Sequence, residues 1–171
     1  MATTNLSDYD VDSVPTGSGL RFGIVVSEWN ADITENLYDG AFEALLKHDV
    51  EEQDIIRLNV PGSFELVYGA KLLIETTDID AVIVIGSVIR GETAHFDYVC
   101  SSVAQGVTDL NIAYHIPIIF GLLTDDNKQQ AIDRSGGAKG NKGTECAVAA
   151  IKMASVAAVM YDDFEEEEIS N

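Results

Sequence analysis

The stretch that decides the fold is Ala81-Val82-Ile83-Val84-Ile85-Gly86-Ser87-Val88-Ile89-Arg90-Gly91-Glu92-Thr93-Ala94-His95-Phe96-Asp97. Its first five residues are apolar and mostly β-branched, which predicts a strand that is buried on both faces. A glycine-bearing loop follows from Gly86, and a helical pattern begins near Phe96. The stretch therefore predicts a strand, a loop and the start of a helix.

Backbone N–H groups at such a helix start carry partial positive charge and favour an anion such as phosphate. His95 lies beside this start, where a cation is unfavourable, so we expect a neutral imidazole that is suited to proton transfer. The other two histidines, His48 and His115, close helical patterns. A charged imidazole is favoured at a helix C-terminus, so we interpret both of these as structural.

On either side of this stretch, short β-branched runs alternate with helical spacing, which is typical of βαβ units and a parallel sheet. We expect four strands, at Phe22 to Val26, Asp54 to Asn59, Ala81 to Ile85 and Ile118 to Leu122.

Each strand is followed by a loop and a helical pattern, so the chain alternates regularly. The expected helices are Ile33 to Lys47, one from about Leu66 to Ile74, Phe96 to Tyr114, Asp125 to Gly136 and Thr144 to Tyr161. The last helix is nearly all small or apolar, which indicates cover on more than one side and favours subunit contacts. The alternative is a central helix of a monomer, which has the same composition.

The 171 residues, 46% of them hydrophobic, are enough for one globular domain. We expect it at residues 20–161, between a polar arm at residues 1–19 and an acidic, solvated tail at residues 162–171. The arm is expected to be disordered or held by something outside its own domain. A formal net charge of −19 argues against nucleic acid or an anionic membrane as a partner.

No apolar run approaches the roughly 18 residues that a membrane span needs, and residues 1–20 lack the features of a secretory signal. We therefore expect a soluble, cytoplasmic protein. Cys100 and Cys146 are far apart and lack metal-ligand spacing. We interpret them as reduced, buried thiols and expect neither a disulfide nor a metal site.

In open parallel α/β sheets, ligands bind outside the carboxyl ends of the strands. The only tryptophan, Trp29, follows the first expected strand, and it is either a ring that stacks on a flat heterocycle or a partly buried core ring. Glu65 follows the second strand and is either a ligand or a favourable helix N-terminal charge. No Gly-x-Gly-x-x-Gly follows a strand, and Gly136 to Thr144 is better interpreted as a turn than as a phosphate loop.

Several spaced motifs resemble those of one family. They are Phe22-Gly23-Ile24-Val25-Val26 with Trp29-Asn30, Pro61-Gly62-Ser63-Phe64-Glu65, Gly86 to Asp97, Phe120-Gly121, Ala131-Ile132-Asp133-Arg134 and Gly140-Asn141-Lys142-Gly143. From about Leu20 to Met160 the chain resembles the 6,7-dimethyl-8-ribityllumazine synthases. The resemblance implies a flavodoxin-like three-layer αβα sandwich with a central four-stranded parallel sheet, and an extra strand that the N-terminal segment contributes to a neighbouring subunit.

The activity implied is the penultimate step of riboflavin biosynthesis. In it, 5-amino-6-(D-ribitylamino)uracil condenses with 3,4-dihydroxy-2-butanone 4-phosphate to give the lumazine, phosphate and water. A substrate amine is the nucleophile, so the enzyme has to orient the substrates and transfer protons. No cofactor or metal is expected.

The resemblance also assigns roles residue by residue. His95 is the proton donor and acceptor, Trp29 stacks on the pyrimidine, and Phe120 is an aromatic from a neighbouring subunit. The pyrimidine and ribityl contacts are Ser63, Phe64, Glu65, Ser87, Val88 and Ile89. The phosphate contacts are Glu92, Thr93, Arg134 and Lys142. Arg134 offers a planar, bidentate fork for phosphate, whereas Lys142 is either a ligand or a solvated turn lysine.

The family forms pentamers with active sites between neighbours, and the short linker from Arg134 to Asn141 resembles that of members that build icosahedral shells. Riboflavin synthase is a further candidate partner. Two competing functions remain open: an enzyme of the same fold that dismutates two lumazines, and a non-enzymatic flavin-binding shell. The presence of both His95 and Arg134 favours the synthase over either.

Overall fold

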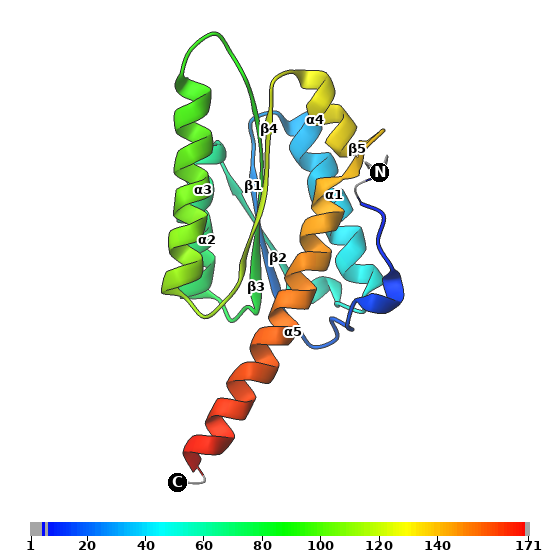
Figure 1. Ribbon diagram of the computed structural model, residues 1–171, viewed down its shortest axis with the longest axis vertical. Helices are drawn as coiled ribbons and strands as arrows, with labels where there is room; N and C mark the ends of the chain where they lie inside the picture. The colour runs from blue at the N-terminus through cyan, green and yellow to red at the C-terminus, as the bar shows by residue number, and fades with distance from the viewer. Residues whose placement is uncertain (1–4, 6, 170–171) are drawn as a thin grey trace.

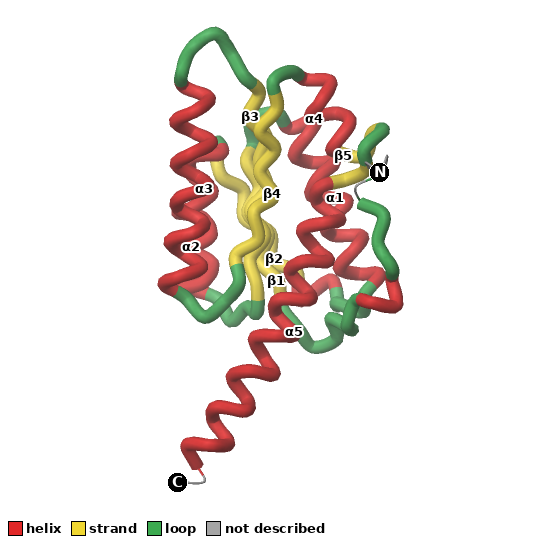
Figure 2. The backbone as a smooth tube through the Cα atoms, in the orientation of Figure 1, coloured by secondary structure: helices red, strands yellow, loops and turns green. Residues whose placement is uncertain are grey.

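A computed structural model describes the backbone of residues 5 and 7–169 and the side chains as far as Tyr161. It has three layers, with a four-stranded sheet in the middle (Figures 1 and 2). Helices α2 (Leu66–Thr76) and α3 (His95–Ala113) cover one face. Helices α1 (Ala31–Lys47), α4 (Lys128–Arg134) and α5 (Lys142–Ile169) cover the other. The predicted αβα sandwich is confirmed.

The sheet contains β1 (Phe22–Ser27), β2 (Ile55–Val60), β3 (Ala81–Ile89) and β4 (Ile118–Asp125). All pairs are parallel, and the order is β2-β1-β3-β4. The chain moves outward from β1 to β2 and then returns to β3 on the other side of β1. The strand order therefore reverses between β1 and β3, where open α/β sheets form their ligand crevice.

Strand β3 is longer than the sequence predicts, and the loop expected from Gly86 begins instead at Arg90. Residues from Gly86 to Ile89 continue the ladder with β4, as far as the pair Ile89 and Asp125. Gly86 serves close packing within the strand, because a Cβ there would lie 2.8 Å from the Ser63 hydroxyl and 2.7 Å from a Leu122 methyl.

Two hydrophobic cores lie on opposite faces of the sheet. Along β3 the side chains alternate between them, so Ile83 packs with α1 and α5 while Val82 and Val84 pack with α2 and α3. Ile83 is opposite both Ile24 and Ile119 in the ladders and is 0% exposed. The central strand therefore holds both cores together.

The ends of two helices differ from their predicted positions. Helix α4 begins at Lys128, three residues later than expected, because the Asn127 side chain caps it by accepting from the Gln130 N–H at 3.1 Å. The turn after it contains a short antiparallel pair, β5 (Ser135–Gly137) and β6 (Gly140–Asn141). Helix α5 continues eight residues beyond Tyr161, through the predicted tail.

From Ser7 onward the N-terminal arm packs on its own chain, which corrects, for these residues, the expectation that the arm is disordered or held from outside. The Ser7 hydroxyl bonds to Asn141, the Tyr9 hydroxyl lies 3.1 Å from His48 Nε2, and Val14 is buried. Between Ser7 and Leu20 the described backbone forms the short 3-10 helix η1 (Val11–Ser13) and no strand. Residues 1–4 and 6 lie outside the described residues, so strand addition to a neighbouring subunit stays a prediction.

Of the two histidines interpreted as structural, His48 is held in place for a different reason from the one expected. His48 does cap the C-terminus of α1, yet it is only 5% exposed, and this burial lowers the pKa of its imidazole, with Lys47 adding to the effect. The charged form is therefore disfavoured rather than favoured. His115 lies just beyond the end of α3 and bonds to the Tyr161 hydroxyl at 2.7 Å.

Helix α5 corrects the expectation that no segment is apolar and long enough to span a membrane. Residues 142–161 meet that criterion by length and composition. Their inner face, which includes Ala147, Ala150 and Ile151, packs into the core against α1. Burial within the domain thus explains the apolar character of this inner face.

Substitutions of Ile83 should show how much the core beneath α1 and α5 depends on β3. We expect Ile83→Ala to lower the free energy of unfolding by about 2–5 kcal/mol, because it leaves a cavity at the centre of the sheet, and Ile83→Val by only about 0.5–1.5 kcal/mol. Denaturant unfolding at one fixed protein concentration measures both. Equal losses for the two variants would contradict the central position of this side chain.

The two cysteines are free, but Cys100 is only half-buried, whereas Cys146 is buried. Burial raises the pKa of the Cys146 thiol to about 11 and also raises the pKa of Cys100. We expect iodoacetamide at pH 8 to label Cys100 slowly and Cys146 only after denaturation, because thiolate and access are both needed. Mass spectrometry of timed samples measures this, and simultaneous labelling of both would contradict it.

Candidate active site

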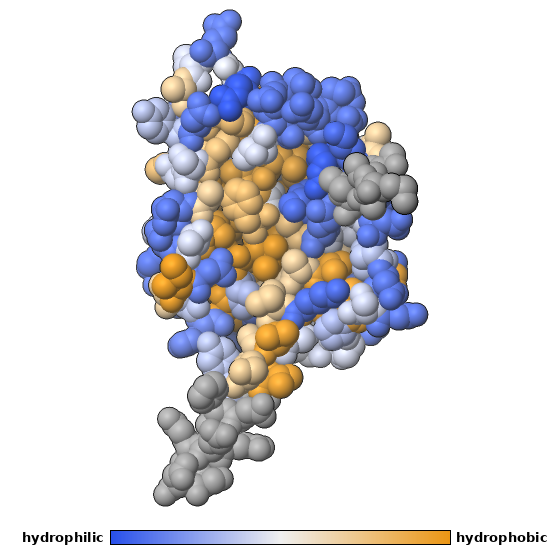
Figure 3. Space-filling view, viewed as in Figure 1, coloured by the Kyte–Doolittle hydropathy of each residue, from blue (hydrophilic) through white to orange (hydrophobic). Residues whose placement is uncertain are grey.

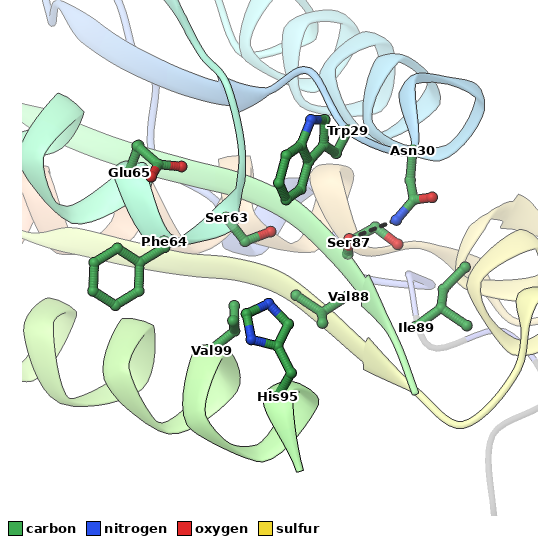
Figure 4. A pocket seen from close by; sticks show the side chains of 10 residues that line it. All are labelled: Trp29, Asn30, Ser63, Phe64, Glu65, Ser87, Val88, Ile89, His95 and Val99. Atoms are coloured by element: carbon green, nitrogen blue, oxygen red, sulfur yellow. Dashed lines mark hydrogen bonds between the residues drawn. The ribbon is translucent and has the colours of Figure 1, made fainter. Parts of the chain in front are cut away.

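A cavity of about 410 Å³ opens where the strand order reverses, at the carboxyl ends of β1 and β3 (Figure 4). Its lining comes from four segments that are far apart in the sequence. The lining residues are Trp29, Asn30, Ser63, Phe64, Glu65, Ser87, Val88, Ile89, His95 and Val99. Eight of these were predicted as site residues from the sequence.

Trp29 forms one wall of the cavity and is 68% exposed, which excludes the alternative of a core ring. Its backbone N–H bonds to the Pro61 carbonyl at 3.3 Å, and a Cβ at Gly62 would lie 3.1 Å from the indole. The Pro61-Gly62 segment thus supports the ring and leaves it open to the cavity. An exposed indole at this position can stack on a flat heterocycle.

The next wall is the 3-10 helix η3 (Ser63–Glu65), which leads directly into α2. Ser63 is nearly buried against β3, while the Phe64 ring is 61% exposed and Glu65 lies at the rim (Figure 4). The close approach depends on Gly86, which has no side chain to hold η3 away from the strand. The cavity therefore presents one aromatic ring on each of two segments.

The floor is the end of β3, which contributes Ser87, Val88 and Ile89. Asn30 holds this strand end in place by donating from Nδ2 to the Ser87 carbonyl at 2.9 Å (Figure 4). Asn30 adopts the left-handed conformation with φ of 59°, which asparagine tolerates better than most residues. It couples the β1 end to the β3 end.

Asn30 and Val99 line the cavity but were not predicted as site residues. Val99 lies one helical turn after His95, so i, i+4 spacing is a signal that could have identified it. For Asn30 the available signal was an asparagine directly before a helix. Neither signal indicates which loops lie together in space. Both residues could therefore be assigned to the cavity only from the tertiary structure.

His95 is the first residue of α3 and directs its ring into the cavity (Figure 4). The N-cap is Ala94, whose methyl group cannot accept from the first N–H groups of the helix. Thr93 Oγ1 lies 3.4 Å from the His95 N–H. The helix start thus retains the properties of an anion site beside a proton-transfer group.

The remaining predicted residues lie outside the cavity of their own chain. Glu92 and Thr93 are exposed in the loop before α3, and Phe120 packs half-buried along β4. Arg134 and Lys142 belong to α4 and α5, on the opposite face of the sheet.

Both of these cations pair with Glu145, at 2.8 Å for Arg134 and 3.2 Å for Lys142. Burial alone would raise the pKa of Glu145, but the hydrogen bond from Arg134 and the nearby Lys142 lower it below its ordinary value. Arg134 also donates to the Lys139 carbonyl at 3.0 Å. The two cations are thus held as a cluster, away from His95 of the same chain.

Among the side chains that the structure describes, no three His, Cys, Asp or Glu residues gather closely enough to hold a metal ion. The arrangement can stack a flat ring, hold an anion at a helix start and move a proton. The fold and this cavity together define the class: an α/β protein with a cavity of small-molecule size, lined partly by aromatic rings, at the switch point of a parallel sheet.

Comparison with known proteins gives the family. The family model of 6,7-dimethyl-8-ribityllumazine synthase matches residues 19–158. A 6,7-dimethyl-8-ribityllumazine synthase from Flavobacterium johnsoniae is 64% identical over 158 residues, which are 91% of this chain and 83% of that protein. One from Parabacteroides distasonis is 59% identical over 160 residues, 92% of this chain and 100% of that protein.

The chain therefore belongs to the 6,7-dimethyl-8-ribityllumazine synthase family. It is an enzyme, and it carries out the lumazine synthase reaction of riboflavin biosynthesis. The lumazine-dismutating and non-enzymatic alternatives are thereby set aside. The family is one of soluble biosynthetic enzymes that form homo-oligomers.

Because Trp29 is the only tryptophan and lines the cavity, its fluorescence should report ligand binding. We expect 5-amino-6-(D-ribitylamino)uracil to quench the emission in a saturable way, since a stacked ring replaces water at the indole. Trp29→Phe should bind the same ligand, measured by equilibrium dialysis, within about tenfold of the original affinity. An unchanged emission at a ligand concentration that dialysis shows to be saturating would contradict stacking on Trp29.

Proposed function

We propose that the cavity binds 5-amino-6-(D-ribitylamino)uracil and that His95 transfers protons during its condensation with 3,4-dihydroxy-2-butanone 4-phosphate. The observation that carries this proposal is that His95, the first residue of α3, opens into the same cavity as Trp29 and Phe64. The aromatic rings suit the flat pyrimidine, and the helix start suits the phosphate.

In the proposed binding mode the pyrimidine stacks on Trp29, and its polar edge meets the backbone of Ser87, Val88 and Ile89. Ser63, Phe64 and Glu65 hold the ring and the ribityl chain. Main-chain groups at the end of a strand are fixed in direction, so they can select one orientation of the ring. Correct orientation is itself a large contribution to rate when the substrate supplies the nucleophile.

The chemistry then needs proton transfers and no enzyme nucleophile. The 5-amino group of the pyrimidine adds to the ketone carbonyl, and loss of water gives an imine. Removal of a proton from the neighbouring carbon allows the C–O bond to phosphate to break, which releases phosphate and leaves an enol. The enol tautomerises to a ketone, and the ribitylamino nitrogen adds to that carbonyl and closes the ring with loss of a second water. His95 is the group placed to accept and return these protons.

We infer that Phe120, Arg134 and Lys142 complete the site from a neighbouring subunit. In their own chain these residues lie away from the cavity, and the exposed rings of Trp29 and Phe64 leave the cavity open on one side. Arg134 would then join Glu92, Thr93 and the start of α3 around the phosphate. A guanidinium fork suits that group, whereas the cavity of the isolated chain has no arginine or lysine among its lining residues.

The surface supports a homo-oligomer, and we propose pentamers that assemble further into an icosahedral shell. Figure 3 shows apolar surface over β4, an edge strand, and over the adjoining part of α5. Met153, Val156 and Val159 of α5 are each about half exposed or more. Apolar patches of this kind, and an unpaired strand edge, are typical of surfaces that another chain covers. The linker between Arg134 and Asn141 is short, which suits shell formation.

We further propose a cytoplasmic enzyme with an arm at residues 1–19, a catalytic domain at residues 20–161 and an acidic tail at residues 162–171. Riboflavin synthase is the proposed protein partner, since it would consume the product. The strongly negative chain supports the expectation that nucleic acid and anionic membranes are not partners.

Lumazine formation followed by absorbance, against the uncatalysed condensation, tests the site. We expect His95→Asn to lower kcat by about 10²-fold or more, and Arg134→Ala to raise KM for the phosphate-bearing ketone by at least tenfold without changing KM for the pyrimidine. Co-assembly of the two variants should restore part of the activity, because some interfaces then combine an intact His95 with an intact Arg134. Mixed assemblies no more active than the separate variants would place both residues in a site made by one chain.

A further inference from the structure

Arg90 joins the loop before α3 to two neighbouring elements. It directly follows β3, and its backbone N–H bonds to the Asp125 carbonyl at 2.9 Å. Its guanidinium donates from Nη1 and Nη2 to the two Asp97 carboxylate oxygens, at 3.3 and 3.0 Å, and from Nε to Asp126 at 3.0 Å. The same group lies over the Phe96 ring, 4.1 Å from its centroid.

The contacts with Asp97 and with the Phe96 ring are made to the first turn of α3, whereas those with Asp125 and Asp126 are made to the end of β4 and the residue after it. Phe96 and Asp97 are the two residues after His95, so Arg90 contacts the helix immediately beside the residue that carries the imidazole. The loop between Arg90 and His95 has few other anchors: Gly91 has open space around it, and the Ala94 side chain makes no capping bond. A bidentate ion pair stacked on an aromatic ring fixes both the distance and the rotation of what it holds.

Arg90 is itself poorly suited to bind phosphate. Each of its three nitrogens already donates to a carboxylate. The cluster of Arg90, Asp97 and Asp126 carries one positive and two negative charges, so it does not attract an anion. The Arg90 guanidinium therefore serves to hold the loop against α3 and the residue after β4, and not to bind an anion.

We propose that Arg90 is a positioning residue for the lumazine synthase reaction: it fixes the first turn of α3 and thereby holds His95 at its place in the cavity. The inference rests on the proposed role of His95. It assigns Arg90 an effect on the chemical steps, through His95, and no direct contact with either substrate.

The chain offers a matched control for this proposal. Arg57 also makes a bidentate ion pair, with Glu35 at 2.9 and 2.6 Å, and lies 4.2 Å from the centroid of the Tyr38 ring. None of these three residues lines the cavity. Arg57→Gln therefore removes the same charge and the same kind of contact elsewhere in the protein.

The test measures kcat and both KM values on the full-length assembled enzyme for Arg90→Gln, Asp97→Asn and Arg57→Gln. We expect the first two to lower kcat on the order of tenfold, because small displacements of a catalytic group are costly, with KM for the pyrimidine unchanged. Arg57→Gln should keep the original kcat. Arg90→Lys should not restore the rate, since an ammonium cannot make the planar, bidentate contact. The melting temperatures of Arg90→Gln and Arg57→Gln show whether the two chains are equally folded.

A double-mutant cycle separates positioning from an independent effect. If Arg90 acts through His95, adding Arg90→Gln to His95→Asn should lower kcat less than twofold further. The proposal is overturned if Arg90→Gln retains the original kcat, if it lowers kcat equally in the His95→Asn background, or if it raises only KM for the phosphate-bearing ketone, which would make Arg90 a phosphate ligand. If His95→Asn itself keeps the original kcat, the assignment of His95 fails, and this inference falls with it.

Discussion

The structure depends on β3 being buried on both faces while paired on both edges. Its apolar residues alternate between the two cores, and β1 and β4 satisfy its backbone N–H and C=O groups. A strand in this position cannot shift by one residue, because such a shift would exchange the side chains of the two cores. The carboxyl end of β3 is therefore fixed relative to the helices around it. That rigidity allows a cavity to be built from the backbone of Ser87 and its neighbours.

The cavity follows from the direction in which the chain leaves β1. Because the strand order reverses between β1 and β3, the loops after these strands turn toward opposite faces and leave a crevice between them. Gly86 lets η3 lie close to β3, and Asn30 ties the end of β1 to the same strand. Trp29 and Phe64 then add aromatic rings to a cavity that also includes the end of β3. The proposed chemistry needs little beyond this: a held ring, a held phosphate and a histidine.

The arginine and lysine side chains of this acidic chain are distributed unevenly. A chain with a formal charge of −19 holds several of its few cations in small clusters with carboxylates. Arg134 and Lys142 gather at Glu145, and Arg90 gathers at Asp97 and Asp126. In each cluster a carboxylate orders the cation before any substrate arrives. A pre-ordered guanidinium loses less freedom on binding or on holding a helix, which suits an enzyme that works mainly by orientation.

The sequence by itself determined the four strands, the helices between them and the residues that follow each strand, because β-branched runs and helical spacing are local patterns. The three-layer sandwich and the roles of Ser87, Val88 and Ile89 came from the resemblance to the family. The local patterns also placed Trp29, Ser63 to Glu65 and His95 at one edge, since parallel strands share their carboxyl ends. Only the tertiary structure decided where β3 ends, that Asn30 and Val99 join the lining, and that Arg134 and Lys142 lie on the other face of the sheet. Those facts depend on which loops meet and on which side each helix packs. Distances between segments far apart in the chain set them, and no local pattern of residues contains that information.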